Sequence, residues 1–328
     1  MTPQTIAAPP PAVASPAARR SIVVVGRRTL ADNVVELSLS RPDGSRLPDW
    51  APGAHIDVVL PDGRTRQYSL CGDRWDAATY RIAVQRESGG RGGSAFLHDN
   101  AGVGFGLSFG GPRNNFRLAP ATDHLFIAGG IGITPLLPMI RQAELLDLPW
   151  RLLYLGRSRS RLAYLDELAA YGARVTVHCA DEIGRAELDA WRPTDPRVRV
   201  YACGPSRLLD AVQAWPPPPG GFPAKVERFT AASTDGSHAE SAFEVVAARS
   251  GATVTVARDE TIVAALGRVG VDVITSCAQG VCGTCETDVL DGRPDHRDSL
   301  LDDAERAASL CMFPCVSRSL GPRLVLDA

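Results

Sequence analysis

Four cysteines near the C-terminus constrain the fold of this chain more than any other feature. Cys277, Cys282 and Cys285 are separated by four and two residues, and Cys315 follows after another 29 residues. Three thiolates on one short loop with a distant fourth form the ligand pattern of a 2Fe-2S cluster. The alternatives are a disulfide framework or a structural zinc site, although zinc knuckles usually repeat a paired-cysteine motif that is missing here. Cys311 is the alternative fourth ligand.

The composition argues against several classes of function. The chain has 328 residues, enough for two or three domains, with 45% hydrophobic and 22% charged residues and a net charge of −2. So small a net charge argues against bulk attraction to nucleic acid or an anionic membrane, and no apolar run reaches transmembrane length. The remaining cysteines are scattered, which favours a reducing cytoplasm; they are Cys71, Cys179, Cys203 and Cys311.

The chain divides into regions with different patterns. Residues 1–20, rich in Ala and Pro, predict a disordered tail, and residues 21–118 carry the short alternating strands of an antiparallel barrel. Strands and helices alternate over residues 119–229, with one helix expected over 162–171, as in a parallel α/β sheet. Residues 230–241 have linker composition. Residues 242–328 predict a hairpin, a helix and the cysteine loop, in the order of a β-grasp fold.

Several short motifs predict binding of phosphate-bearing cofactors. Residues 66–70 place Arg, an aromatic ring and a hydroxyl together at a strand end, and residues 89–94 are glycine-rich, with Ser94 placed to cap a following helix. The turn Gly129–Pro135 lies between a strand and a helix, as a phosphate-binding turn requires, but departs from G-x-G-x-x-G. Taken singly, these are also compatible with an edge strand, a hairpin loop and, at Cys203, a structural cysteine.

Together and in this order, the motifs resemble one family. The chain is similar to phthalate dioxygenase reductase-type proteins, the reductase components of Rieske oxygenases and demethylases, from about residue 20 to 328. The resemblance also rests on Cys203-Gly204-Pro205 and Glu227-Arg228-Phe229. It implies a multidomain fold of α/β plus all-β type: a ferredoxin-reductase-like flavin β-barrel, an α/β nucleotide-binding domain and a C-terminal β-grasp 2Fe-2S ferredoxin domain. The implied cofactors are FMN, NADH and the cluster.

The resemblance also assigns residues to these cofactors. Arg66 and the 92–94 loop would contact the FMN phosphate, Tyr68 and Ser69 the flavin ring, and Phe229 would shield the flavin where nicotinamide enters. The expected cofactor-binding set is Arg66, Gln67, Tyr68, Ser69, Ala83, Val84, Gly92, Gly93, Ser94, Gly130, Thr134, Pro135, Arg157, Cys203, Gly204 and Phe229, with Cys277, Cys282, Cys285 and Cys315 as metal ligands.

The implied activity is electron transfer from NADH through FMN and the cluster to a Rieske-type oxygenase, acting on an aromatic or similar organic substrate. Flavin bridges a two-electron donor and a one-electron acceptor, so no catalytic side chain is assigned. The alternative is a reductase of a haem monooxygenase or another metal-centred acceptor. A plain ferredoxin-like carrier would leave the first two domains unexplained. Arginines 157, 159 and 161 could accept the 2′-phosphate of NADPH, but the family resemblance favours NADH. We expect a monomer.

Overall fold

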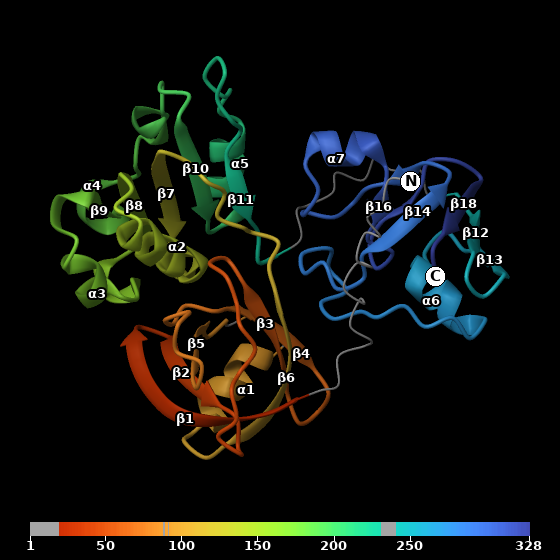
Figure 1. Cartoon of the computed structure of the whole chain (residues 1–328), viewed down its shortest axis with the longest axis horizontal. Coiled ribbons are helices and arrows are strands. Elements are labelled where there is room, and N and C mark those ends of the chain that lie inside the picture. The colour runs from red at the N-terminus through yellow and green to blue at the C-terminus, as the bar shows by residue number, and fades with distance from the viewer. Residues whose placement is uncertain (1–19, 88, 91, 231–240) are drawn as a thin grey trace, which may run out of the picture.

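A computed structural model describes residues 20–87, 89–90, 92–230 and 241–328 of the chain. The predicted tail (1–20) and linker (230–241) lie outside the described residues except for their end positions 20, 230 and 241. Three main sheets are present, and each belongs to one unit, called here the barrel, the α/β unit and the cluster unit. In Figure 1 the α/β unit lies above the barrel, and the cluster unit lies beside both.

The barrel is an antiparallel sheet in the order β4-β3-β6-β1-β2-β5. An isolated bridge between Leu70 and Ile82 joins the end of β4 to β5 and closes the sheet. Alternate residues such as Ile22 and Val24 point into one apolar core, as the period of a strand dictates. The elements are β1 Arg20–Ala31, β2 Val34–Ser40, β3 His55–Val59, β4 Thr65–Ser69, β5 Tyr80–Gln85, α1 Gly93–Asn100 and β6 Gly106–Arg113.

The α/β unit is a parallel sheet in the order β11-β10-β7-β8-β9. Phe126 packs in the core beneath α2, whereas its neighbours Leu125 and Ile127 pack in the core beneath α5, so both faces of the sheet are covered. The elements are β7 Asp123–Gly129, η1 Gly130–Gly132, α2 Ile133–Leu145, β8 Trp150–Gly156, η2 Arg159–Arg161, α3 Leu165–Ala169, η3 Gly172–Arg174, β9 Val175–Cys179, α4 Ala180–Ile183, η4 Leu188–Trp191, β10 Val198–Cys203, α5 Ser206–Gln213 and β11 Lys225–Glu227.

The helix expected over residues 162–171 is shorter than predicted. Only Leu165–Ala169 is α-helical, because Tyr164 adopts a left-handed backbone conformation with φ of 65° and breaks the helical run. The apolar spacing that suggested a longer helix comes instead from residues such as Leu162, which pack into the same core from the preceding turn.

The cluster unit is a mixed sheet in the order β13-β12-β18-β14-β16, with β12 and β18 parallel. The predicted hairpin and helix are present, and the Thr261 hydroxyl caps that helix by accepting the Ala264 N–H at 3.1 Å. The strands from β14 onward were not predicted from the sequence. The elements are β12 Phe243–Ala247, β13 Ala252–Val256, α6 Ile262–Arg268, β14 Thr287–Asp291, β15 Pro294–Asp295, α7 Asp303–Ala308, β16 Cys311–Met312, β17 Arg318–Ser319 and β18 Arg323–Leu326.

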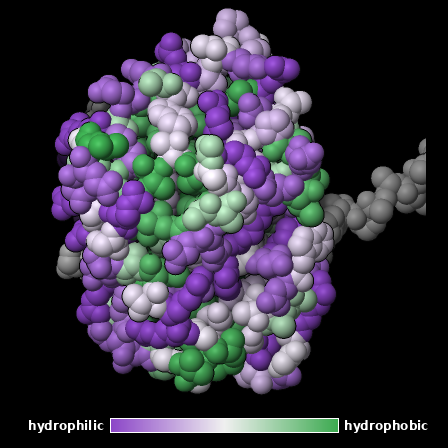
Figure 2. All heavy atoms as spheres, turned by 90° about the vertical axis from the view of Figure 1, so that its left-hand side faces the viewer, coloured by the Kyte–Doolittle hydropathy of each residue, from purple (hydrophilic) through white to green (hydrophobic). Residues whose placement is uncertain are grey.

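The surface is mixed in character. Figure 2 shows the face on the side of α3 and β1, where separate apolar patches lie among hydrophilic side chains. Across the described residues, none of the helices has the length and hydropathy needed to span a membrane.

Candidate functional site

The cysteine loop brings the four predicted metal ligands into the interior of the cluster unit. Cys277, Cys282, Cys285 and Cys315 are all buried, and Cys285 and Cys315 share one apolar cluster. Cys311 is only half-buried and belongs to β16, where it pairs with β14. Burial therefore favours Cys315 over Cys311, and the ligand assignment itself stays a prediction.

The backbone of the cysteine loop turns N–H donors toward sulfur. The N–H of Gln279 donates to Cys277 Sγ at 3.2 Å, and that of Thr284 donates to Cys282 Sγ at 3.4 Å. Gly280 allows the tight path with φ of 66°. Buried thiols surrounded by N–H donors fit an iron–sulfur cluster, because such hydrogen bonds stabilise thiolate charge and tune the potential.

The cysteine loop lies directly against the barrel. The Asn115 amide donates to the Cys282 carbonyl at 3.0 Å, and a Cβ on Gly283 would lie 2.6 Å from the same amide nitrogen. Ser276 Oγ donates to Oδ1 of the buried Asp57 at 2.9 Å. A side chain at position 283 would therefore displace the Asn115 amide that holds the loop.

The start of α1 forms a cradle suited to a phosphate. Gly92 has φ of 77°, and a Cβ on it would lie 2.7 Å from Arg64 Nη1. A Cβ on Gly93 would lie 2.5 Å from Arg66 Nε. Two guanidinium groups beside a helix N-terminus fit the FMN phosphate. Arg64 was not predicted, and its only signal is its place two residues before Arg66.

The expectation that Ser94 caps this helix is wrong. The N-cap of α1 is Gly92, which has no side chain to cap with, and Ser94 lies inside the first turn. The Ser94 hydroxyl instead accepts the N–H of Glu87 at 3.1 Å. Ser94 therefore ties the chain after β5 to the helix, and its contact with FMN stays a prediction.

A groove where the three units meet contains the residues expected to bind the flavin ring. Phe229 is 41% exposed, so little packing holds its side chain and it can give way to an entering ring. The barrel contributes His55, Gln67, Tyr68 and Ser69, the α/β unit contributes Glu227, Arg228 and Phe229, and the cysteine loop contributes Val281.

Glu227 and His55 are ionisable side chains in this groove that were not among the expected residues. Glu227 Oε2 is shielded from solvent without a hydrogen-bond partner among the described residues, and burial raises the pKa of this carboxyl to about 8. Burial, helped by the nearby Arg113 charge, lowers the pKa of His55 to about 4. Both groups are therefore mainly neutral at pH 7. Glu227 could have been found from its place in the motif before Phe229, whereas His55 gave no signal.

The glycine turn after β7 packs on the loop after β10. A Cβ on Gly132 would lie 2.2 Å from the Cys203 carbonyl oxygen, and one on Gly204 would lie 2.9 Å from Gly129 Cα. Cys203 is fully buried and pairs in register with Glu227 on β11. Burial, with the Glu227 charge adding to it, raises the pKa of the Cys203 thiol well above its usual range. Both loops lie at the carboxyl edge of the sheet, where nucleotides bind.

The remaining expected residues do not line the groove. Thr134 and Pro135 are buried in the first turn of α2, and the Thr134 hydroxyl donates to a backbone carbonyl of the preceding turn at 3.0 Å. Ala83 and Val84 have side chains in the packed cores. Arg157 is exposed after β8. These five cofactor contacts stay predictions.

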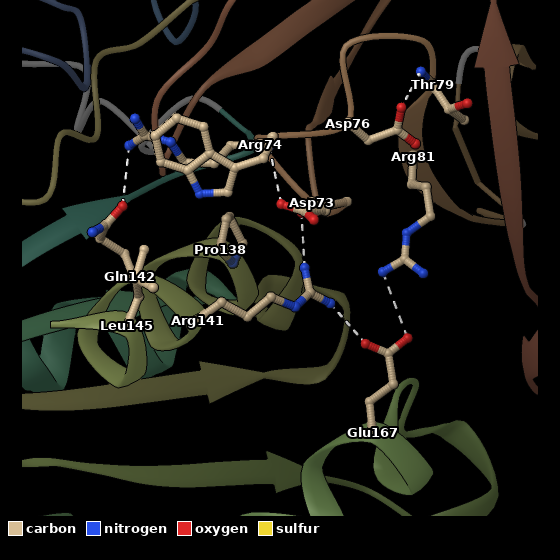
Figure 3. Close-up of a pocket in the computed structure, with 12 residues that line it drawn as sticks. Asp73, Arg74, Asp76, Thr79, Arg81, Pro138, Arg141, Gln142, Leu145 and Glu167 are labelled. Carbon is tan, nitrogen blue, oxygen red and sulfur yellow. Dashed lines mark hydrogen bonds and ion pairs between the residues drawn. The ribbon is translucent and has the colours of Figure 1, made fainter. Parts of the chain in front are cut away.

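A larger groove of about 520 Å³ lies elsewhere, at the seam between the barrel and α2. Figure 3 shows its lining, in which arginines face carboxylates. None of the expected cofactor residues lines it, and its opposite charges pair with one another, as Arg141 does with Glu167. The residues expected to contact the flavin ring, Tyr68, Ser69 and Phe229, therefore line the smaller groove and not this one.

Comparison with known proteins identifies the family. Residues 245–319 match the family described as 2Fe-2S iron-sulfur cluster binding domain. The chain is 46% identical to phenoxybenzoate dioxygenase subunit beta of Ectopseudomonas oleovorans, over 90% of this chain and 93% of that protein. It also resembles the solved structure of phthalate dioxygenase reductase, described as modular for electron transfer from pyridine nucleotides to [2Fe-2S], with 34% identity, a TM-score of 0.67 and coverage of 95% and 98%.

A second solved structure is similar over a part of its length. An intact type IV self-sufficient cytochrome P450 monooxygenase superposes with a TM-score of 0.86 and 39% identity over 94% of this chain. The match covers 41% of the P450 chain, so this chain spans less than half of that protein.

The fold and the groove define a flavin- and iron–sulfur-containing oxidoreductase built from three units. The chain belongs to the phthalate dioxygenase reductase-type family, the reductase components of oxygenase systems. Membership of this family confirms the predicted fold class and the cofactors FMN, NADH and 2Fe-2S. It also confirms the activity of passing electrons toward an oxygenase.

Proposed function

We propose that this chain delivers electrons from NADH to a Rieske-type terminal oxygenase or demethylase that acts on an aromatic or similar organic substrate. The observation that carries the proposal is the groove in which all three units meet. Its walls come from the barrel, from the end of the α/β unit and, through Val281, from the loop that holds the cluster cysteines. The groove has a free volume of about 40 Å³, so Phe229 would have to move aside for a flavin ring to lie between the donor site and the exit toward the cluster.

The barrel residues hold and orient the flavin in this proposal. Arg64 and Arg66 with the Gly92–Gly93 backbone bind the FMN phosphate, while Tyr68 and Ser69 line the ring site. FMN, when bound, supplies the conversion from a two-electron donor to a one-electron acceptor. The protein therefore needs to position two rings and exclude water, and no side chain has to move a proton in the hydride step.

The α/β unit presents the nicotinamide to that ring. We place the pyrophosphate at the glycine turn that begins at Gly130, and the nicotinamide beside Cys203 and Phe229. Burial raises the pKa of Glu227, so its carboxyl is mainly protonated at neutral pH. It therefore adds no unfavourable negative charge beside the nicotinamide position. The preference for NADH is supported by Arg159, which pairs with Glu182 at 3.4 Å and is less available for a 2′-phosphate.

The kind of oxygenase is tested by reconstitution. The P450 match is the specific observation that favours the second candidate, a haem monooxygenase as acceptor. We expect NADH-dependent reduction of the metal centre of a purified Rieske oxygenase, monitored by electron paramagnetic resonance. Reduction of a haem monooxygenase, with no reduction of the Rieske protein, would establish the second candidate instead.

Charge supports a docking site on the cluster unit. Residues 241–328 contain 13 acidic and 8 basic residues, a net charge of −5, whereas the whole chain carries −2. We expect this unit to meet a basic patch on the oxygenase, so that electron delivery slows as salt rises. A rate independent of salt would mean that these acidic residues serve only solubility.

We also infer that the chain works in the cytoplasm. All eight cysteines are free, including the four outside the predicted cluster set, which supports a reducing compartment. The expected monomer stays a prediction that sedimentation equilibrium would test.

A further inference from the structure

A buried polar contact joins the barrel to the α/β unit at Tyr164. This residue follows β8 and is 4% exposed, and its hydroxyl donates to Glu36 Oε2 on β2 at 2.9 Å. Cys71 Sγ lies 3.1 Å from the same hydroxyl, and Glu36 also accepts from Arg28 Nε at 2.9 Å. The left-handed backbone of Tyr164 is uncommon for a residue with a side chain, and such conformations persist where the surroundings enforce them.

A second contact centres on Glu167, in α3. Its carboxylate lies 3.0 Å from Arg28 and 3.6 Å from Arg81, both in the barrel, and 2.7 Å from Arg141, in α2. In Figure 3, Arg81 and Arg141 reach Glu167 from different sides of the seam. Arg141 also donates to the barrel carbonyls of Cys71 and Gly72, at 2.7 and 2.8 Å. Two charged residues of the α/β unit, one in α2 and one in α3, therefore contact the barrel.

These contacts connect to the glycine turn that we assign to the nucleotide. The Tyr154 hydroxyl lies within hydrogen-bond distance of two carbonyls that share its one hydrogen, those of Gly130 at 3.2 Å and Ala163 at 3.1 Å. Ala163 directly precedes Tyr164, so a short run of hydrogen bonds leads from the barrel to the nucleotide turn. In the same loop, Ser160 Oγ donates to Asp32 of the barrel at 2.6 Å.

We propose that Tyr164 and Glu167 are positioning residues for hydride transfer. They fix the α/β unit on the barrel at the angle that places a nicotinamide held by the Gly130 turn over the flavin groove. The physical reason is that hydride transfer needs the reacting atoms in near contact, and a small misplacement by a distant change costs rate steeply. The inference rests on the proposed route from NADH to FMN.

The test uses the full-length, FMN- and cluster-loaded protein with Tyr164→Phe, Glu167→Gln and the pair combined. Stopped-flow mixing with NADH measures the rate of flavin reduction and the long-wavelength charge-transfer absorbance that reports stacking of nicotinamide on flavin. We expect the pair to lower the rate roughly tenfold or more and to weaken the charge-transfer band. FMN content and the cluster spectrum should match those of the wild type.

The matched control is Glu144→Gln. Glu144 pairs with Arg174 and accepts from Trp150 Nε1 at 2.6 Å, so it makes a comparable set of contacts wholly inside the α/β unit. We expect this variant to lose thermal stability without losing the charge-transfer band. A lowered unfolding temperature in the seam variants, with rate and band at wild-type values, would overturn the positioning role. Absence of flavin reduction by NADH in the wild type would instead overturn the proposed route.

Discussion

The barrel makes two very different interfaces within this chain. Toward the α/β unit it is held by a network of charged and buried polar contacts, centred on Glu36 and Glu167. Toward the cluster unit, the side-chain hydrogen bonds between described residues have an uncharged donor, as in those from Asn115 to the cysteine loop and from Ser276 to Asp57. Hydride transfer needs fixed near-contact geometry, whereas an electron can cross a longer gap. The stronger interface therefore lies where the chemistry tolerates the least displacement.

The largest effect is expected from removing the cluster. Electron transfer out of the protein should stop, whereas hydride transfer across the interface between the barrel and the α/β unit should be unaffected. Cys315→Ser should abolish or grossly destabilise the 2Fe-2S spectrum, because it removes a buried thiolate that no other residue replaces. Reduction of flavin by NADH should persist. Optical and paramagnetic resonance spectra measure both, and Cys311→Ser is the control that should keep its cluster. A normal cluster in the Cys315 variant would mean that the fourth ligand is elsewhere.

Removal of the whole cluster unit should also stop electron transfer to a protein acceptor, with nearly the same loss of rate as loss of the cluster alone. A truncation that ends at Phe229 should fold, bind FMN and oxidise NADH with a dye acceptor, because the barrel and the α/β unit keep their shared network. It should fail to reduce cytochrome c. Aggregation of the fragment would show that the cluster unit covers a surface that the other two units need buried. Undiminished cytochrome c reduction would show that the cluster is not the required exit.

A change inside the barrel should affect the flavin without altering either interface. Arg66→Ala removes a charge-assisted phosphate contact, so FMN binding should weaken by about 1.5–3 kcal/mol. Fluorescence titration of the apoprotein with FMN measures the loss. Arg46→Ala is the control, since Arg46 pairs with Asp49 on the exposed surface of the barrel. Equal FMN affinity in the two variants would remove Arg66 from the phosphate site.

The sequence predicted the order of units and most strands because each depends on local pattern. Local sequence alone is enough to recognise the C-x4-C-x2-C loop, the glycine turn at residues 129–132 and the alternating strands. The Ser94 cap was mispredicted because the helix begins two positions earlier, after a left-handed Gly92. Contacts such as Tyr164 with Glu36, 128 residues apart, could not be predicted, because nothing local marks the partner. The same holds for His55 in the groove.

The smallest expected effect is on the pH dependence of stability, and it comes from Glu227, which the α/β unit contributes to the groove. Burial raises the pKa of Glu227 to about 8, so the folded protein favours the protonated acid while the unfolded chain ionises near its ordinary pKa of 4.5. The native state therefore loses stability as pH rises from about 5 to 8, by at most about 1.4 kcal/mol per pH unit.

Glu227→Gln removes that titration. The free energy of unfolding of this variant, relative to that of the wild type, should therefore grow by about 1–2 kcal/mol between pH 6 and 8. Denaturant unfolding of the FMN-bound proteins measures the difference, with Glu144→Gln as a carboxylate control outside the groove. Parallel curves for Glu227→Gln and the wild type would show that water or a bound group ionises this carboxyl normally.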